Sequence, residues 1–136
     1  MNGFSLNDSK ANGRGLKLMV VDDSNIIRSR IARIALQPTL RGINIVGLAR
    51  NGVEAIAMFE KTHPDVVTMD LTMPEMDGGT CVSELMRRNA DVNILIVSAL
   101  SDKATAIDAL KRGAKGFIYK PFTDQQLAAA LLEVVS

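Results

Sequence analysis

The stretch that decides the fold is LKLMVVDD, residues 16–23, a short apolar run that ends in two acidic residues. Four similar apolar runs follow it: INIVGLA (43–49), DVVTM (65–69), NILIVS (93–98) and GFIY (116–119). Their apolar character is nearly continuous rather than alternating, which is typical of parallel strands covered on both faces. We therefore predict strands at 17–21, 43–49, 65–69, 93–98 and 116–119.

The segments between and after these runs carry apolar residues at helical spacing, each set forming one stripe on a helix. The sets are Ile27, Ile31 and Ile34; Ile56 and Phe59; Val82, Leu85 and Met86; Ile107 and Leu110; and Leu127, Leu131 and Val134. Helix boundaries are marked by Pro38, Pro64, Gly113 and a capping-box pair, Thr123 and Gln126. Strict alternation of strand and helix predicts an α/β fold, a doubly wound parallel sheet with five helices.

Length, charge and cysteine content narrow the class of protein. A chain of 136 residues corresponds to roughly one domain, and we expect residues 1–15 to form a flexible N-terminal tail ahead of a domain at 16–136. The formal charge of +1 disfavours a nucleic-acid partner. The longest strongly apolar run, 127–132, is far shorter than the roughly 20 residues that span a bilayer. A single cysteine, Cys81, allows no intrachain disulfide and no thiolate metal site. These features predict a cytoplasmic protein without a membrane or nucleic-acid partner.

Polar residues follow four of the five apolar runs at the point where each run ends. They are Asp22 with Asp23, Asp70, Ser98 and Lys120. Each taken alone has an ordinary explanation as a helix cap, a turn residue or a surface lysine. The carboxyl ends of parallel strands, however, emerge at one edge of the sheet, where ligands bind. The joint occurrence therefore predicts a functional site at that edge.

Three carboxylates held together need cations, because a pair about 4 Å apart repels by on the order of 4 kcal/mol at an effective dielectric constant of about 20. A small set of oxygen ligands completed by water favours Mg²⁺. The charges of Mg²⁺ and Lys120 would together balance the three carboxylates. Such a site can accept a phosphoryl group, and a carboxylate can attack it to form an acyl phosphate.

These residues also carry a family resemblance. Asp22-Asp23, Asp70 within MDLTMPEMDG (69–78), Ser98-Ala99 and Lys120-Pro121-Phe122 together resemble the receiver domain of two-component response regulators. The resemblance covers residues 16–136 and extends to stand-alone regulators of the chemotaxis type. It implies a flavodoxin-like, five-stranded sheet of order 2-1-3-4-5.

The resemblance also implies a role for each site residue. Asp70 would accept a phosphoryl group from a sensor histidine kinase or a phosphotransfer protein. Mg²⁺ would be held by Asp23, Asp70 and the backbone carbonyl of Thr72, with Asp22 acting mostly through water. Lys120 and Ser98 would contact the phosphoryl group.

Two further positions follow from the same resemblance. Ser98 and Phe117 would form the switch that responds to phosphorylation, and Pro121 would follow a cis peptide bond. Since no DNA-binding segment follows the last helix, we expect output by contact with a downstream protein, such as the flagellar motor or another signalling protein.

Two other functions remain open at this point. The first is a Mg²⁺-dependent phosphatase with Asp70 as its nucleophile, although the position two residues later is Thr72 rather than a second acid. The second is an interaction module that no longer takes phosphate. The leading expectation is a switch and not an enzyme, with only self-catalysed phosphoryl acceptance and slow autodephosphorylation.

Three other features have simpler interpretations. His63, which precedes Pro64, is expected to cap a helix end. Cys81 is expected to be a small, partly buried helix residue. Arg28, Arg30 and Arg33 are expected to form the exposed face of the first helix, with docking of a kinase on that helix as the alternative.

Overall fold

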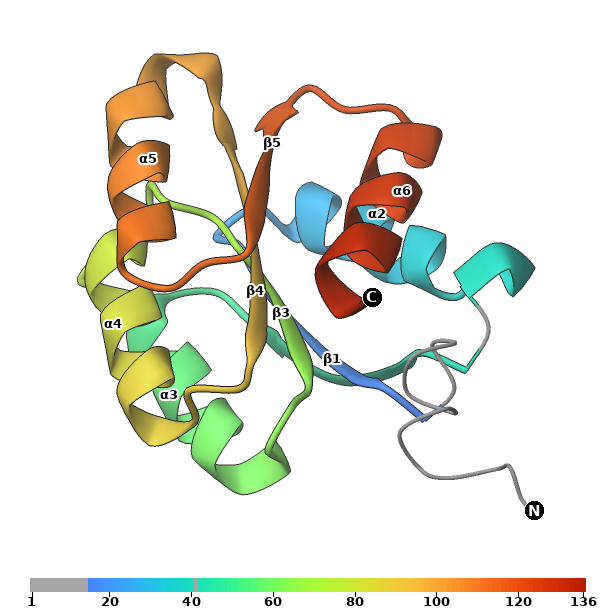
Figure 1. Ribbon diagram of the computed structural model, residues 1–136, viewed down its shortest axis with the longest axis horizontal. Coiled ribbons are helices and arrows are strands. Elements are labelled where there is room, and N and C mark those ends of the chain that lie inside the picture. The colour runs from blue at the N-terminus through green and yellow to red at the C-terminus, as the bar shows by residue number, and fades with distance from the viewer. Residues whose placement is uncertain (1–14, 41) are drawn as a thin grey trace.

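The computed structural model describes residues 15–40 and 42–136. The tail predicted at 1–15 therefore lies outside the described residues, apart from Gly15. The described part is an α/β sandwich in which one parallel sheet separates two layers of helices (Figure 1).

The sheet has five parallel strands in the order β2-β1-β3-β4-β5, the order implied by the family resemblance. The strands are β1 (Lys17–Val21), β2 (Asn44–Ala49), β3 (Val66–Met69), β4 (Asn93–Ala99) and β5 (Gly116–Lys120). Every predicted strand end lies within one residue of the observed end. The doubly wound parallel sheet is confirmed.

The helices cover both faces of this sheet, α2 and α6 on one side and α3, α4 and α5 on the other (Figure 1). Their bounds are α2 (Asn25–Ala35), α3 (Gly52–Thr62), α4 (Gly78–Arg88), α5 (Lys103–Lys111) and α6 (Asp124–Val135). Two short 3-10 helices, η1 (Pro38–Leu40) and η2 (Leu100–Asp102), follow α2 and β4.

Strand β1, in the interior of the sheet between β2 and β3, is buried on both faces. Leu18 and Val20 pack into the apolar cluster beneath α2 and α6, while Met19 and Val21 pack into the cluster beneath α3, α4 and α5. All four are at most 1% exposed. Because fully burying a large apolar side chain contributes about 1.5–3 kcal/mol, a continuously apolar strand is favoured at this position.

Side chains cap several helices, although the N-cap of α2 is Ser24 rather than Asp22 or Asp23. The Ser24 hydroxyl accepts from the Ile27 amide at the start of α2. At the start of α6, Thr123 and Gln126 form both hydrogen bonds of the predicted capping box. Gly113 follows α5 with φ of 123°, a conformation that side chains disfavour.

The prediction that Ile107 and Leu110 form the buried face of α5 is wrong. The helix buries Ala106 and Ala109 completely, whereas Ile107 is 41% exposed and Leu110 lies at the margin of the core. Small alanine side chains allow the helix to lie close to the sheet, and a search for large apolar residues gives them too little weight.

No helix in the described part of the chain is long and apolar enough to cross a lipid bilayer.

Candidate functional site

The predicted site residues converge at the carboxyl edge of the sheet. Asp22 follows β1 and Asp70 follows β3, and these strands are direct neighbours. The Asp22 amide donates to the Ala49 carbonyl at 3.0 Å, and the Asp70 amide donates to the Val21 carbonyl at 2.9 Å. The ladder hydrogen bonds thus continue one residue past β1 and β3 and fix the backbone of both acids.

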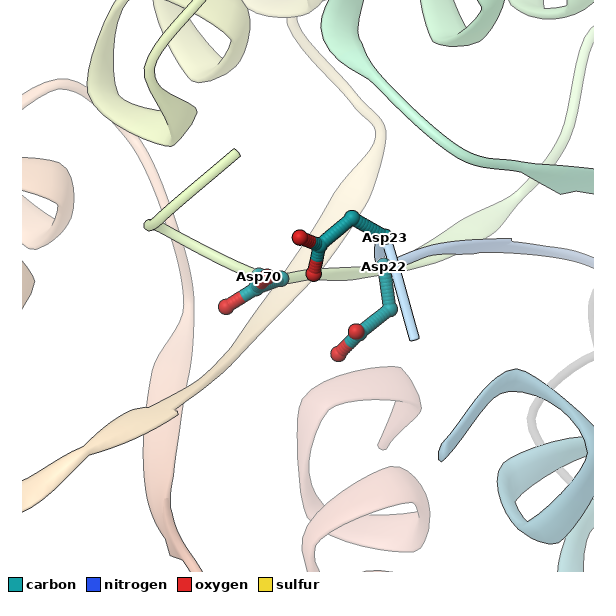
Figure 2. A group of neighbouring side chains, drawn as sticks. All are labelled: Asp22, Asp23 and Asp70. Atoms are coloured by element: carbon teal, nitrogen blue, oxygen red, sulfur yellow. The ribbon is translucent and has the colours of Figure 1, made fainter. Parts of the chain in front are cut away.

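Three carboxylates form a cluster at this edge. One carboxylate oxygen from each of Asp22, Asp23 and Asp70 lies within 4.8 Å of the others. Figure 2 shows the three side chains gathered where β1 and β3 end. Asp22 and Asp70 are buried, at 1% and 4% exposure, while Asp23 is open to solvent. The cluster therefore has a buried floor and one side accessible from outside.

Lys120, the last residue of β5, supplies a positive charge to the cluster. Its Nζ lies 2.8 Å from Asp22 Oδ2 and 3.3 Å from Asp70 Oδ1. Asp22 Oδ1 on the other side accepts from the Ser24 amide at 2.9 Å. One ammonium thus balances only part of the charge of the three carboxylates.

The electrostatic environment shifts the pKa values of two site residues. Burial raises the pKa of Asp70 to about 6, with the negative charge of Asp22 as the second cause and Lys120 opposing it. Burial by itself lowers the pKa of Lys120, but the adjacent Asp22 and Asp70 raise it more, so the net pKa lies above its ordinary value. The lysine is therefore charged, and Asp70 is a carboxylate at neutral pH.

The donor set fits a hard divalent cation. All three clustered side chains offer carboxylate oxygens, and the one exposed member leaves room for water ligands. The partial excess of negative charge is what such an ion would neutralise. Thr72 lines the same cavity as Asp70, and its backbone carbonyl remains a predicted ligand.

The remaining predicted residues lie on β4 and β5. Ser98 is completely buried, and its Oγ has no hydrogen-bond partner among the described residues. In the β4–β5 ladder Ser98 pairs with Tyr119 and Ala99 pairs with Lys120. Ser98 therefore lies one ladder position from the lysine. The Lys120–Pro121 peptide bond is cis, as the resemblance implies.

Phe117 lies three residues before Lys120, at the far side of β5 from the site, and is partly buried. Its ring packs against the core cluster beneath α3, α4 and α5 and contacts the Tyr119 ring edge-on, with 5.3 Å between centroids. The proposed switch position is therefore packed between core and surface in this structure.

A cavity of about 430 Å³ opens over the acids and includes two residues that sequence reasoning missed. Asp102 and Ser101 from η2 line it together with Asp70 and Lys120. The Thr72 hydroxyl donates to Asp102 Oδ2 at 3.0 Å, which joins the loops after β3 and β4 at the cavity mouth. Asp102 stands at the cap position of α5 but makes no capping hydrogen bond.

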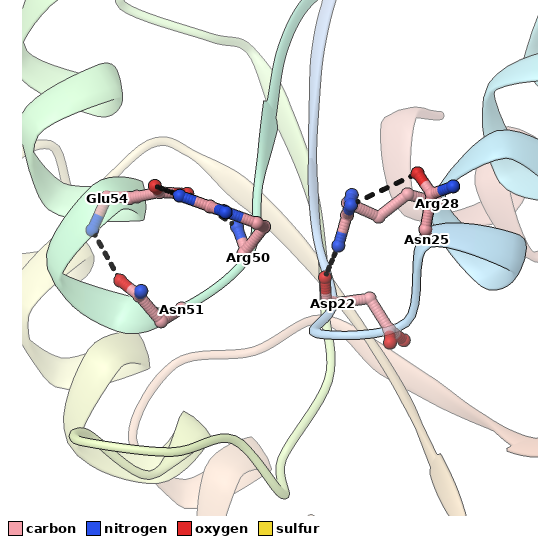
Figure 3. Close-up of polar contacts among 6 residues, drawn as sticks. All are labelled: Asp22, Asn25, Arg28, Arg50, Asn51 and Glu54. Carbon is pink, nitrogen blue, oxygen red and sulfur yellow. Dashed lines mark hydrogen bonds and ion pairs between the residues drawn. The ribbon is translucent and has the colours of Figure 1, made fainter.

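The expectation that all three arginines of the first helix are exposed is wrong for Arg28. Arg28 is 8% exposed, and its Nη1 donates to the Asp22 carbonyl at 2.7 Å (Figure 3). Arg30 is half-buried, because its guanidinium donates to the Phe122 carbonyl at 2.6 Å and lies 4.5 Å from the Phe122 ring centre. Only Arg33 is exposed as expected.

Two residues set aside by the sequence analysis stay outside the site. His63 ends α3 with a left-handed backbone and donates its amide to the Phe59 carbonyl, which makes it a helix cap. Cys81 is fully rather than partly buried, and burial raises the pKa of its thiol to about 12. A thiol in that state is not a nucleophile at neutral pH.

Comparison with known proteins identifies relatives over nearly the whole chain. Residues 18–132 match the family model of the response regulator receiver domain. The chain is 38% identical over 120 residues to the chemotaxis protein CheY of Thermotoga maritima, covering 88% of this chain and 98% of that protein. It is also 46% identical over 125 residues to a protein-glutamate methylesterase/protein-glutamine glutaminase of Pseudoalteromonas atlantica, but spans only 32% of that protein.

Comparison with solved structures also identifies a CheY protein. A crystal structure of the CheX-CheY-BeF3-Mg²⁺ complex of Borrelia burgdorferi aligns with a TM-score of 0.82 and 32% identity, covering 94% of this chain and 99% of that chain. The sheet order, the acidic cluster with its lysine and the family match therefore agree. The chain belongs to the family of response regulator receiver domains, and its resemblance to the CheY-type members covers nearly their whole length.

Proposed function

We propose that this protein is a single-domain response regulator, with its receiver domain at residues 16–136, that accepts a phosphoryl group on Asp70 in a Mg²⁺-dependent reaction. The observation that carries this proposal is the gathering of Asp22, Asp23 and Asp70 within 4.8 Å, with Lys120 contacting two of them. This arrangement matches the charge requirement of phosphoryl transfer, in which cations stabilise the phosphoryl oxygens.

The proposed metal ligands are Asp23, Asp70 and the backbone carbonyl of Thr72, with Asp22 acting mostly through water. When bound, Mg²⁺ neutralises charge on the phosphoryl oxygens. Lys120 supplies a second positive charge to the same oxygens. Support for Ser98 as a contact comes from its buried hydroxyl, which has no other partner in the described structure.

The proposed reaction transfers the phosphoryl group from nitrogen to oxygen. A carboxylate oxygen of Asp70 attacks the phosphorus atom of a phosphohistidine, the phosphorus–nitrogen bond breaks, and its electron pair returns to the imidazole ring. With a pKa of about 6, Asp70 is mostly ionised at neutral pH and can act as the nucleophile. Solvent access through Asp23 and the cavity mouth gives the donor a path to Asp70.

The proposed donor is a sensor histidine kinase or a phosphotransfer protein that docks beside this cavity. Ile26, on the first turn of α2, is 78% exposed and lies three residues from Asp23. An exposed isoleucine next to the acidic site is a suitable apolar contact for such a donor.

The proposed output is contact with a downstream protein in the cytoplasm, in a chemotaxis pathway. Support comes from the CheY of Thermotoga maritima, which is related over almost its full length. The proposed target is the flagellar motor or another signalling protein. We propose a switch that undergoes slow self-catalysed dephosphorylation rather than an enzyme with turnover.

Transfer of labelled phosphate from a purified, autophosphorylated kinase of the source organism tests this function. The protein should acquire the label only with Mg²⁺ and should retain it as an acid-stable, base-labile acyl phosphate. Incubation with a generic phosphate ester separates the switch from the phosphatase alternative. Multiple turnovers of that ester would contradict the switch. If none of the kinases transferred label to the protein, the interaction module would be favoured.

A further inference from the structure

A positively charged side chain is buried directly behind the acidic cluster. Arg28 is 8% exposed, although burying a guanidinium is costly unless its donors are satisfied. Its Nη1 donates to the Asp22 carbonyl at 2.7 Å, and its Nη2 donates to Asn25 Oδ1 at 3.2 Å (Figure 3). Arg28 thus spans from α2 back to the end of β1.

The atom that Arg28 contacts has a particular place in the chain. The Asp22 carbonyl belongs to the peptide bond that joins Asp22 to Asp23, so fixing it orients both acids. The amide of Asp22 donates to the Ala49 carbonyl of β2, which holds the other side of the same residue. The carboxylate of Asp22 accepts from the Ser24 amide and pairs with Lys120, so the carbonyl, the amide and the side chain of Asp22 are all held.

From this geometry we propose that Arg28 is a positioning residue of the metal site. Its guanidinium holds the Asp22–Asp23 turn in the conformation that presents both carboxylates to Mg²⁺. The inference rests on the proposed function, because it assumes that the cluster binds Mg²⁺. Groups that orient metal ligands without touching the ion change metal affinity by about 10- to 100-fold when they are removed.

The charge and the geometry of Arg28 predict opposite effects, which makes the role testable. A nearby positive charge repels Mg²⁺, so if charge alone mattered, removing it would tighten Mg²⁺ binding. If Arg28 orients the turn, removing it weakens Mg²⁺ binding, because part of the binding free energy is then used to order the two acids.

The experiment is a Mg²⁺ titration of the metal-free protein, monitored through the backbone amide resonances of Asp23 and Asp70 in two-dimensional NMR spectra. We expect Arg28→Met to weaken Mg²⁺ affinity about 10-fold. Arg28→Lys should restore part of the loss, since an ammonium can still donate to the Asp22 carbonyl. Arg33→Met is the matched control, because Arg33 is exposed on the same helix, and it should bind Mg²⁺ as the wild type does.

A milder variant covers the case in which Arg28→Met does not fold. Asn25→Ala removes only the side-chain acceptor that supports the Arg28 guanidinium, and it should weaken Mg²⁺ binding by less than Arg28→Met. Chemical unfolding in EDTA, run in parallel, measures stability separately from affinity.

The outcomes separate this inference from the proposed function. No saturable Mg²⁺ binding by the wild type would contradict the proposed function itself. Normal wild-type binding with unchanged or tighter binding in Arg28→Met would overturn only the role of Arg28, as would lower stability with unchanged affinity. Where Arg28→Met does not fold, unchanged affinity in both Arg28→Lys and Asn25→Ala overturns it equally.

Discussion

Lys120 Nζ lies closer to Asp22 Oδ2, at 2.8 Å, than to Asp70 Oδ1, at 3.3 Å. The lysine therefore bridges the two buried acids and neutralises repulsion that would otherwise oppose folding. A phosphoryl group on Asp70 would offer this ammonium new acceptor oxygens and compete with Asp22 for it. The same ion pair thus links the stability of the site to its proposed chemistry.

Replacing this lysine should destabilise the metal-free protein. Lys120→Met leaves Asp22 and Asp70 buried without their cation, and because the lysine side chain is 24% exposed we expect a loss of about 1–3 kcal/mol in the free energy of unfolding. Saturating Mg²⁺ should recover part of that loss by linkage. Urea unfolding with EDTA or Mg²⁺ measures both effects, and Lys115→Met, on an exposed residue, serves as the control. Equal stability of wild type and Lys120→Met in EDTA would contradict this.

The raised pKa of Asp70 predicts a pH-dependent cost to stability. The folded protein binds the Asp70 proton more tightly than the unfolded chain, so this residue favours folding at pH values below about 4, and that contribution is lost as pH rises through about 6. In EDTA at pH 8, Asp70→Asn should therefore be more stable than the wild type by on the order of 1–3 kcal/mol.

The advantage of Asp70→Asn should shrink as the pH falls and disappear below about pH 4. Thermal or urea unfolding across this range measures it. Asp91→Asn, in an exposed turn, controls for the general effect of losing a carboxylate. A stability difference that is independent of pH would show that the pKa of Asp70 is not raised by folding.

Asp102 at the cavity mouth should slow the approach of anionic phosphoryl donors. Its carboxylate adds negative charge to a cavity that already contains Asp23 and Asp70. Asp102→Asn keeps an acceptor for the Thr72 hydroxyl but removes the charge, so phosphorylation by a small anionic donor should be about 2- to 3-fold faster at low salt. The difference should fade as salt is raised.

Thr72→Val is the matched control for this prediction, because it breaks the 3.0 Å hydrogen bond while leaving the Asp102 charge in place. Rapid-quench measurements of acyl phosphate formation at several salt concentrations would decide the matter. If Asp102→Asn is no faster at low salt, or faster by the same factor at high salt, charge is not the cause.

Ser98 should couple phosphorylation to the rest of the domain. Its buried hydroxyl has no partner among the described residues, so it is free to move toward a phosphoryl oxygen. We expect Ser98→Ala still to bind a beryllofluoride mimic at Asp70 but to lose the mimic-dependent shift of the Phe117 ring resonances. Thr68→Val removes another buried, unpartnered hydroxyl, in the middle of β3, and should keep that shift. A full shift in Ser98→Ala would mean that another route connects Asp70 to Phe117.

The fold was largely predictable from the sequence, because each strand is a nearly continuous apolar run, and polar site residues stand at the end of four of the five runs. The acids of the site were predictable for the same reason, since Asp22 and Asp70 stand at strand ends that the parallel topology brings together. The inner face of α5 was not, because Ala106 and Ala109 give a weak apolar signal.

The other misses depend on contacts between residues far apart or on the direction of a long side chain. The Thr72–Asp102 hydrogen bond joins two exposed loop residues with no pattern that relates them. The burial of Arg28 depends on its guanidinium turning back toward the Asp22 carbonyl rather than out to solvent. Helical spacing places a residue on a face but does not say where a flexible charged side chain ends.

The central claim is that Asp70 accepts a phosphoryl group in a Mg²⁺-dependent reaction, and intact-protein mass spectrometry tests it most directly. After incubation with a small phosphoramidate donor and Mg²⁺, the wild type should gain the mass of one phosphoryl group, and peptide mapping should place it on Asp70. The gain should be absent with EDTA and absent in folded Asp70→Asn, whose amide cannot attack phosphorus. A phosphoryl group found on another residue, or gained equally by Asp70→Asn or in EDTA, would contradict the account.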